Sequence, residues 1–266
     1  MSGRTMGSMD ASIKLTNVDK RIGEKVILEG VNFTVPRGRV TVLIGPSGAG
    51  KTVSIKHILG LTHPNRGTVE VEGKDLARIS DEELNALRRD MAVVLQGALP
   101  FTCGLFYSLN IYENVAFPLR ERNTRWTEEK IDQVTMDHLT MVGMRDSAEK
   151  MPDQISAGMT KRVAIARALA LRAGIVIIDD FDSGIDGVRL ALLTELIHDA
   201  QRRSGSTYLV TTHDMNAART LADHAVVISA GKIIAEGPAD EVLGSSEPLV
   251  HQLVEGEREG PLTLRG

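Results

Sequence analysis

One segment, residues 39–61, constrains the fold of this chain more than any other. It opens with a continuous apolar run, RVTVLI, continues with GPSGAGKT, and ends in a pattern typical of a helix, KTVSIKHILGL. The central eight residues match G-x-x-x-x-G-K-[ST], a loop that wraps around phosphate groups. The match is specific because the motif requires a strand before it and a helix after it. The segment therefore predicts a strand, a phosphate-binding loop and a helix in direct succession.

Each residue type in this loop has a physical role in binding a nucleotide. Glycines let backbone N–H groups turn towards phosphate oxygens, and the start of the following helix adds its positive dipole end. The side chain of Lys51 would reach the β- and γ-phosphates, and the hydroxyl of Thr52 would bind Mg²⁺. We expect all eight residues to contact the nucleotide: Gly45, Pro46, Ser47, Gly48, Ala49, Gly50, Lys51 and Thr52.

A second apolar run ends in two adjacent carboxylates. The β-branched residues IVII (175–178) lead directly into Asp179 and Asp180. In proteins with this phosphate-binding loop, a neighbouring strand ends beside the loop and offers an acid to the magnesium. We expect Asp179 to be the metal-side acid and Asp180 to orient or deprotonate the attacking water. An acidic cap at a helix N-terminus is the alternative.

The rest of the pattern predicts an α/β fold around a mainly parallel sheet. Short apolar runs alternate with helical stretches, which is typical of strands buried on both faces with helices between them. The runs are RVTVLI, MAVVL, IVIID, TYLVTT and AVVIS. Upstream, IKLTNV, NFTV and GTVEVEG are shorter and more alternating, which favours an antiparallel β patch.

The chain divides into a central domain with two tails. Residues 1–11 are expected to be a flexible tail, and residues 12–244 the nucleotide-binding domain. Residues 101–160 carry helical patterns without a convincing strand, and we expect them to form an inserted helical subdomain. Residues 245–266 are polar and turn-rich and are expected to form a C-terminal tail.

Composition argues against several classes of function. A net charge of −4 gives no indication of a nucleic-acid partner. No apolar run approaches the roughly 20 residues that span a bilayer, so no direct membrane insertion is expected. The single cysteine, Cys103, excludes an intrachain disulfide.

Aromatic residues gather in one part of the chain, between positions 101 and 126. They form either the core of a small lobe or a surface that faces a partner, since aromatic side chains are enriched at the centres of interfaces. The six residues are Phe101, Phe106, Tyr107, Tyr112, Phe117 and Trp126.

Over residues 12–240 several phosphate-site motifs occur in a fixed order, and here the chain resembles the ATP-binding cassette (ABC) ATPases. GPSGAGKT resembles the Walker A motif and IVIIDD the Walker B motif. The other counterparts are the Q-loop glutamine (Gln96), the signature motif (ISAGMTKRVAIARAL, 155–169), the D-loop (SGID, 183–186) and the switch histidine (His213). The six motifs together imply the fold of these P-loop NTPases, with ATP and Mg²⁺ as ligands.

The resemblance also implies that two subunits build each site. Two ATP molecules lie between head-to-tail subunits, each held by Walker A of one chain and the signature motif of the other, and a homodimer is expected. Ser156 and the backbone N–H of Gly158 would hold the γ-phosphate across this interface, because a helix start binds anions. His213 would contact the same phosphate, and Gln96 would sense the metal and the attacking water.

Four positions depart from the family pattern. Asp180 replaces the usual glutamate, which draws the carboxylate back by roughly 1.3 Å, and a misplacement of about 1 Å can cost on the order of 100-fold in rate. Phe181 replaces a proline and Ala157 a glycine. Ile22 stands where an aromatic residue usually stacks on adenine, and Ile22, or nearby Lys20 or Arg21, can cover the base without π-stacking. The alternatives are hydrolysis with the shorter acid and a catalytically impaired subunit that binds ATP and regulates a partner.

A finer resemblance is to the ATPase of MCE-type bacterial lipid transporters, carried by NIYENVAFPLRER (110–122) and EPLVHQLVEGEREGP (247–261). It implies a cytoplasmic motor, peripheral on the inner face of the cell membrane, that contacts an integral-membrane permease through residues 97–120. Its C-terminal tail would reach the partner subunit. The loop after Gln96 is longer than the family pattern, which indicates an enlarged permease-facing loop or an insertion without consequence. ABC ATPases of DNA repair or translation usually carry a long coiled coil or two cassettes, and this sequence shows neither.

Overall fold

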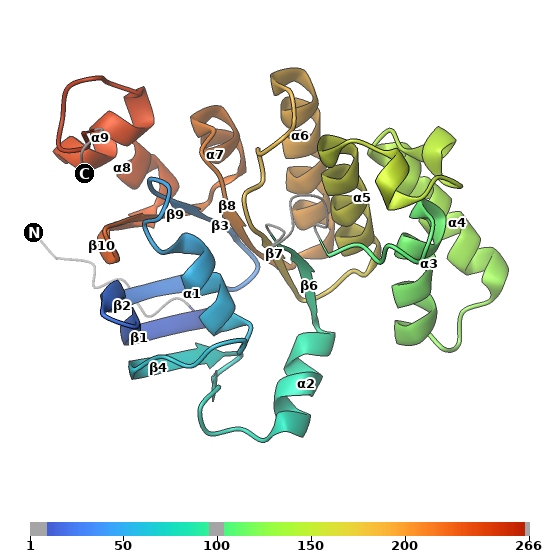
Figure 1. Ribbon diagram of the computed structural model, residues 1–266, viewed down its shortest axis with the longest axis horizontal. Helices are drawn as coiled ribbons and strands as arrows, with labels where there is room; N and C mark the ends of the chain where they lie inside the picture. Colours follow the sequence, from blue (N-terminus) through green and yellow to red (C-terminus); the bar gives the residue numbers. More distant parts are fainter. Residues whose placement is uncertain (1–9, 96–103, 264–266) are drawn as a thin grey trace, which may run out of the picture.

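The computed structural model describes residues 10–95 and 104–263, and its strands form two sheets (Figure 1). The strands are β1 (Ala11–Ile22), β2 (Lys25–Pro36), β3 (Val40–Ile44), β4 (Arg66–Val71), β5 (Lys74–Asp75), β6 (Met91–Val94), β7 (Ile175–Ile178), β8 (Thr207–Thr211), β9 (His224–Ser229) and β10 (Lys232–Pro238). One sheet has six strands in the order β10-β9-β3-β8-β7-β6, and the other has four in the order β2-β1-β4-β5.

Helices follow most strands of the six-stranded sheet. They are α1 (Lys51–Ile58), α2 (Asp81–Arg89), α3 (Ile111–Arg122), α4 (Glu128–Met141), α5 (Ala157–Ala170), α6 (Gly187–Ser204), α7 (Met215–Leu221), α8 (Ala239–Leu243) and α9 (Pro248–Glu255), with short 3-10 helices at Arg145–Ser147 and Pro152–Gln154. Strand β3 pairs in parallel with β8 and β9, and β7 pairs in parallel with β6 and β8. Strand β10 is antiparallel to β9. The predicted α/β fold with a mainly parallel sheet is confirmed.

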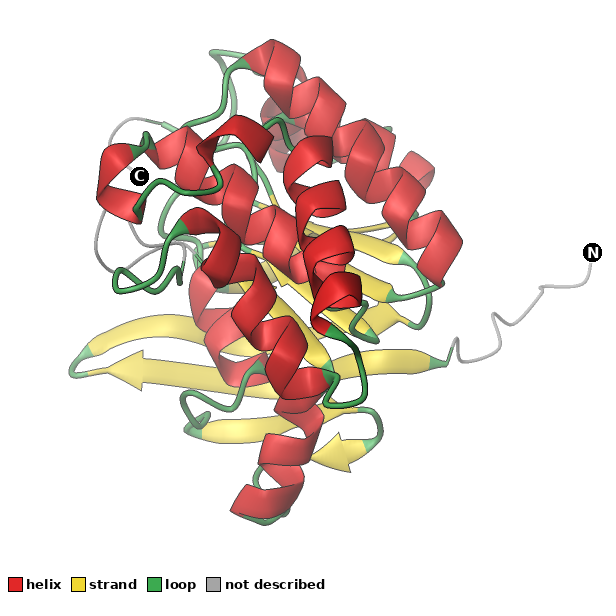
Figure 2. Cartoon of the chain, turned by 90° about the vertical axis from the view of Figure 1, so that its right-hand side faces the viewer, coloured by secondary structure: helices red, strands yellow, loops and turns green. Residues whose placement is uncertain are grey.

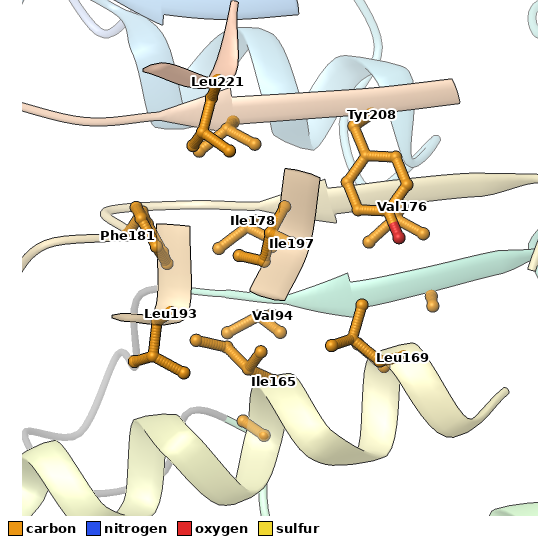
Figure 3. Packing of buried hydrophobic residues seen from close by; sticks show 14 of the residues in the cluster. Val94, Ile165, Leu169, Val176, Ile178, Phe181, Leu193, Ile197, Tyr208 and Leu221 are labelled. Carbon is orange, nitrogen blue, oxygen red and sulfur yellow. The ribbon is translucent and has the colours of Figure 1, made fainter. Parts of the chain in front are cut away.

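The central strands of the six-stranded sheet, β9, β3, β8 and β7, are buried on both faces. Along β7, Val176 and Ile178 belong to the core formed with α5 and α6, whereas Ile175 and Ile177 face the core formed with α1 and the four-stranded sheet. Most helices lie on one side of the strands in Figure 2, and Figure 3 shows side chains of the first core. Fully burying a valine or isoleucine contributes about 1.5–3 kcal/mol. Burial on both faces therefore fixes the chain where β7 ends.

The antiparallel patch is confirmed, but its strands are longer than the sequence indicates. Strands β1 and β2 have 12 residues each and pair antiparallel. Their register shifts between Leu15 and Val18, where Asn17 adopts a left-handed backbone with a φ of 49°. Such bulges interrupt the alternation of buried and exposed side chains, and this interruption makes one long strand resemble short ones in the sequence. The edge strand β10, half-exposed along most of its length, was not predicted.

The part of residues 101–160 that the structure describes is helical. Asn110 caps α3 by accepting a hydrogen bond from the backbone of Glu113, and Thr127 caps α4 in the same way through Lys130. Figure 1 shows α3 and α4 on the far side of the molecule from β1 and β2. The limits of the helical subdomain, of the flexible tail at residues 1–11 and of the domain at residues 12–244 stay proposals.

The C-terminal segment contains a helix where the sequence indicates turns. Glu247 caps α9 by accepting a hydrogen bond from the backbone N–H of Val250 at 2.8 Å. Pro248 is the first residue of this helix, a position where proline is favourable. Val250 and Val254 are buried against the domain, so this helix is stabilised by packing.

Candidate active site

Two glycines of the loop between β3 and α1 are required, one by a close backbone contact and the other by its backbone conformation. A Cβ atom added to Gly45 would lie 2.0 Å from the carbonyl oxygen of Ile228, and one added to Gly50 would lie 2.6 Å from Leu28 Cδ2. Gly50 also has a φ of 114°, which larger residues rarely adopt. At Gly48, with a φ of 80°, conformation alone favours glycine, because a Cβ there would meet nothing within 4 Å. The predicted strand, loop and helix are present.

Lys51, the first residue of α1, is buried and bends back over the loop. Its Nζ donates hydrogen bonds to the carbonyl oxygens of Gly45 at 2.6 Å and Pro46 at 3.1 Å. Burial lowers the pKa of its ammonium group, and three nearby aspartates oppose this shift. These aspartates are Asp179, Asp180 and Asp182. A phosphate could replace the two carbonyls and supply a full negative charge to the lysine.

Asp179 is held by threonines from two other elements and is 1% exposed. Its Oδ2 accepts a hydrogen bond from Thr52 Oγ1 at 2.8 Å, and its Oδ1 accepts one from Thr211 Oγ1 at 2.7 Å. The parallel pairing of β7 and β8 brings Thr211 to this point. The sheet therefore places Asp179, the acid predicted to face the metal, beside Thr52, whose hydroxyl is predicted to bind Mg²⁺.

The pair of Thr52 and Asp179 fits a magnesium ion bound together with a nucleotide. Octahedral Mg²⁺ binds oxygens at 2.0–2.1 Å, which sets adjacent ligands about 2.9 Å apart. The two oxygens here are separated by 2.8 Å. The described part of the chain contains no cluster of three or more His, Cys, Asp or Glu side chains that could hold a metal. Two protein oxygens suit the usual arrangement in which phosphates and water complete the shell.

Asp180 follows in a left-handed backbone conformation with a φ of 59°. Its backbone N–H donates to Thr211 Oγ1 at 2.7 Å, and its carbonyl oxygen accepts a hydrogen bond from Lys161 Nζ. The next residue, Phe181, is fully buried and lies among core side chains (Figure 3). The aromatic ring thus anchors the chain where the family usually has proline.

His213 follows β8 with an exposed side chain. Its backbone N–H donates to Asp182 Oδ1 at 2.9 Å, and Thr212 Oγ1 donates to the same oxygen at 2.7 Å. Asp182 therefore ties the loop after β7 to the loop after β8. Sequence analysis missed Asp182, Thr211 and Lys161, because no local pattern indicates which distant backbone each one binds.

The signature segment begins helix α5 and packs on the D-loop of its own chain. Ser156 is exposed and caps the helix by accepting a hydrogen bond from the backbone N–H of Met159 at 3.3 Å. A Cβ added to Gly158 would lie 2.3 Å from the carbonyl oxygen of Gly184. The helix start thus touches residues 183–186 and leaves its serine accessible.

One predicted site residue, Ile22, lies apart from this cluster. Ile22 ends β1 at a hairpin tip and is 61% exposed. Its strand passes the phosphate-binding loop, because Lys20 pairs with Leu28, whose side chain faces Gly50. Ile22 therefore lies beyond the loop, where it could cover a base. Gln96 lies outside the described residues.

Comparison with known proteins identifies the family. Residues 28–183 match the family model described as ABC transporter. A relative from Mycobacterium bovis, named probable ribonucleotide transport ATP-binding protein mkl, is 40% identical over 96% of this chain and 70% of its own length. The intermembrane phospholipid transport system ATP-binding protein MlaF of Escherichia coli K12 is 32% identical over 95% of this chain and 92% of its own. MlaF of Haemophilus influenzae is 34% identical, with 95% and 94% covered.

Solved structures agree with the sequence relatives. The dimeric structure of a bacterial ABC transporter cassette has a TM-score of 0.77 at 31% identity and covers 85% of this chain and 98% of its own. A dimeric post-hydrolysis state of the same cassette, bound to ADP and Pi, has a TM-score of 0.76. Within residues 10–95 and 104–263, no helix is both long and apolar enough to cross a membrane. The family match, the curated relatives and the shared fold together show that this chain belongs to the ABC transporter family, as an ATP-binding subunit that hydrolyses ATP.

Proposed function

We propose that this chain is the motor subunit of an MCE-type transporter that moves lipids through a separate membrane permease. The observation that carries the proposal is the match to MlaF over nearly the full length of both chains. The name of that relative states phospholipid transport. The proposal places the subunit in the cytoplasm, peripheral on the inner face of the cell membrane.

Each residue of the site has a separate role in ATP hydrolysis. The N–H groups of residues 47–50 and of the start of α1 bind the phosphates, and Lys51 exchanges its two carbonyl partners for phosphate oxygens. Magnesium, bound with ATP, supplies positive charge at these oxygens, and Thr52 and Asp179 are the side chains that would hold it. Asp180 accepts a proton from the attacking water while the water oxygen bonds to the γ-phosphorus and the bond to the ADP oxygen breaks.

The remaining site residues bring in a second subunit. The exposed Ser156 and the N–H of Gly158, both of the partner subunit, complete the γ-phosphate site, and His213 contacts the same phosphate. Val188 and Leu192, one turn apart near the start of α6, are 74% and 62% exposed. Their position directly after the D-loop supports an apolar contact with a second copy.

An aromatic surface on the helical subdomain supports contact with a permease. Phe106, Tyr107 and Phe117 are 46%, 44% and 41% exposed, and the rings of Phe106 and Phe117 meet edge to face with centroids 5.9 Å apart. Tyr112 and Trp126 instead pack against the core, so the interpretation as a partner-facing surface is proposed for the three exposed residues only. Phe101 lies outside the described residues. Exposed aromatics at the centre of a patch are typical anchors of protein interfaces.

A buried asparagine organises this aromatic surface. Asn114 is fully buried, accepts a hydrogen bond from the N–H of Phe106 at 2.7 Å and donates to its carbonyl oxygen at 3.0 Å. The carbonyl oxygens of Leu109 and Asn110 also lie 2.9 Å from its Nδ2, so the two amide hydrogens are shared among three acceptors. These bonds fix the turn before α3, and a preordered surface loses less entropy on binding. We therefore assign the permease contact to residues 97–120, of which 104–120 are described.

The C-terminal tail is a weaker candidate for contact with the partner subunit. The side chain of Gln252, 6% exposed, donates to the carbonyl oxygen of Leu262 at 3.0 Å and accepts from its N–H at 2.7 Å. Residues up to 262 are therefore held against α9 of their own chain. A contact between subunits through residues 245–266 would use the outer side of this folded segment.

Reconstitution with the permease tests the proposed function. The purified complex in proteoliposomes should move a fluorescent phospholipid between membranes when ATP is supplied. The complex with Lys51→Ala should not. In a second assay, Phe106→Ala combined with Phe117→Ala should release the subunit from the permease, whereas Met141→Ala, a change at an exposed side chain on α4, should not.

Ribonucleotide is the second candidate cargo, because the name of the 40% identical relative states ribonucleotide transport. If uptake of a labelled ribonucleotide depended on ATP and on Lys51 while lipid movement did not, the lipid proposal would be wrong.

A further inference from the structure

Lys161 is a buried lysine on α5 that reaches the loop after β7. Its side chain is 5% exposed, and its Nζ donates to the carbonyl oxygen of Asp180. The same Nζ lies 4.0 Å from Asp180 Oδ2, on a side chain that is 13% exposed. One ammonium group thus contacts both the backbone and the carboxylate of the acid assigned to hydrolysis.

The backbone of Asp180 needs such support. A non-glycine residue with a positive φ is uncommon because its Cβ crowds the carbonyl oxygen, and it persists where surrounding contacts fix it. Thr211 Oγ1 accepts the N–H of Asp180 at 2.7 Å, and the buried ring of Phe181 holds the next residue. Lys161 holds the remaining end of the residue, its carbonyl group. These three contacts fix the backbone of Asp180 and thereby the direction of its Cα–Cβ bond.

We propose that Lys161 is a positioning residue that sets the direction of the Asp180 carboxylate and so offsets the shorter reach of aspartate. The inference rests on the proposed role of Asp180 as the acceptor of the proton from water. In this role Lys161 acts through Asp180, whose carbonyl and carboxylate oxygens lie beside its Nζ. An ammonium suits the task because it carries three donors on a flexible stem and can serve a carbonyl and a carboxylate together.

The same lysine links two motifs of one chain. It lies one turn after Gly158, whose Cα packs on the carbonyl of Gly184, so helix α5 contacts the loop after β7 at two points. A shift of the helix start would therefore be transmitted to Asp180. The position of the hydrolysis acid depends on the signature helix of its own subunit.

Kinetics of Lys161 variants test this inference. Lys161→Met keeps the length and apolar stem of the side chain and removes the charge, and Lys161→Arg keeps a cation. We expect Lys161→Met to lower kcat on the order of 10–100-fold, the range for a misplacement approaching 1 Å, while the KM for ATP and the affinity for a fluorescent ATP analogue stay unchanged. Lys161→Arg should recover part of kcat. Lys130→Met, at an exposed lysine on α4, is the matched control and should resemble the wild type.

A second background separates positioning from a general structural role. In the Asp180→Glu background, Lys161→Met should cost less in kcat, because the longer side chain depends less on one backbone position. All rates are measured well below the melting temperature of each variant, so that unfolding does not contribute. An unchanged kcat for Lys161→Met, equal losses in the two backgrounds, or a loss confined to KM would overturn the inference.

Failure of this inference is distinguishable from failure of the proposed function. These assays measure hydrolysis by the purified subunit and by its permease complex, and they do not depend on the cargo. If lipid movement were absent while Lys161→Met still lowered kcat, the transport proposal would fail and the role of Lys161 would stand.

Discussion

Replacing Gly158 with alanine tests the packing between the signature helix and the D-loop. The new Cβ would lie 2.3 Å from the carbonyl oxygen of Gly184. Carbon and oxygen atoms approach to about 3.3 Å at closest, so the helix start must move by about 1 Å. Overpacking of this kind costs about 1–3 kcal/mol, which corresponds to roughly 2–4 °C per kcal/mol in melting temperature for a domain of this size.

Gly158→Ala should also lower the rate of ATP hydrolysis, and this loss should be larger than the modest loss of folding stability would cause. A 1 Å shift of groups that position a substrate costs on the order of 100-fold in rate. We therefore expect Gly158→Ala to lower the steady-state rate of phosphate release by about 10–100-fold. Binding of a fluorescent ATP analogue to the isolated subunit should remain, because the Walker A loop is unchanged.

A nearby glycine provides the control for Gly158→Ala. A Cβ added to Gly187 would meet nothing within 4 Å, so Gly187→Ala should leave phosphate release within about twofold of the wild type, as for most surface substitutions. Full turnover by Gly158→Ala would refute the reasoning. So would a loss of ATP binding by the isolated subunit, which would place the defect in the Walker A loop.

Three further predictions concern the candidate site, and a fourth concerns a buried tyrosine of the core. Lys51→Ala should abolish binding of ATP in a fluorescence titration, and tight binding by this variant would contradict the loop assignment. His213→Ala should spare this binding and lower phosphate release on the order of 100-fold; unchanged release would remove its role. Asp180→Glu should raise kcat by less than about tenfold, because contacts already position the aspartate, whereas a gain near 100-fold would favour the impaired-subunit alternative. Burial raises the pKa of Tyr208 to about 12, so the unfolded chain loses this proton first and stability should fall between about pH 10 and pH 12 by roughly 2–3 kcal/mol; Tyr208→Phe should lack this part of the fall in denaturant titrations.

The Walker A loop and the parallel sheet could be predicted because each is encoded locally. The G-x-x-x-x-G-K-[ST] spacing of residues 45–52 lies in one continuous segment between a strand and a helix. The apolar runs report burial on both faces of the sheet without reference to any partner strand. The loop can therefore be recognised in the sequence as a motif, and the buried strands as continuous apolar runs.

The contacts that hold the acids could not be predicted in the same way. Thr211 reaches Asp179 and Asp180 because β8 pairs with β7, and Lys161 reaches Asp180 because α5 packs over the end of that strand. Each is an ordinary residue in its own segment, and its role depends on the tertiary arrangement. Helix α9 was missed for a related reason, since residues 245–266 are polar and turn-rich overall, and the burial of Val250 and Val254 against the domain is known only from the fold.

Mixing two inactive variants tests the central claim that each ATP site is shared between two subunits. Lys51→Ala inactivates the Walker A loop, and Ser156→Arg blocks the start of the signature helix. Each variant alone should release almost no phosphate. In a symmetric dimer, mixed pairs contain one site with an intact loop from one copy and an intact signature from the other. An equal mixture should therefore recover roughly a quarter of the wild-type rate if pairing is random and sites act independently. No recovery in mixtures shown to exchange subunits would contradict the account.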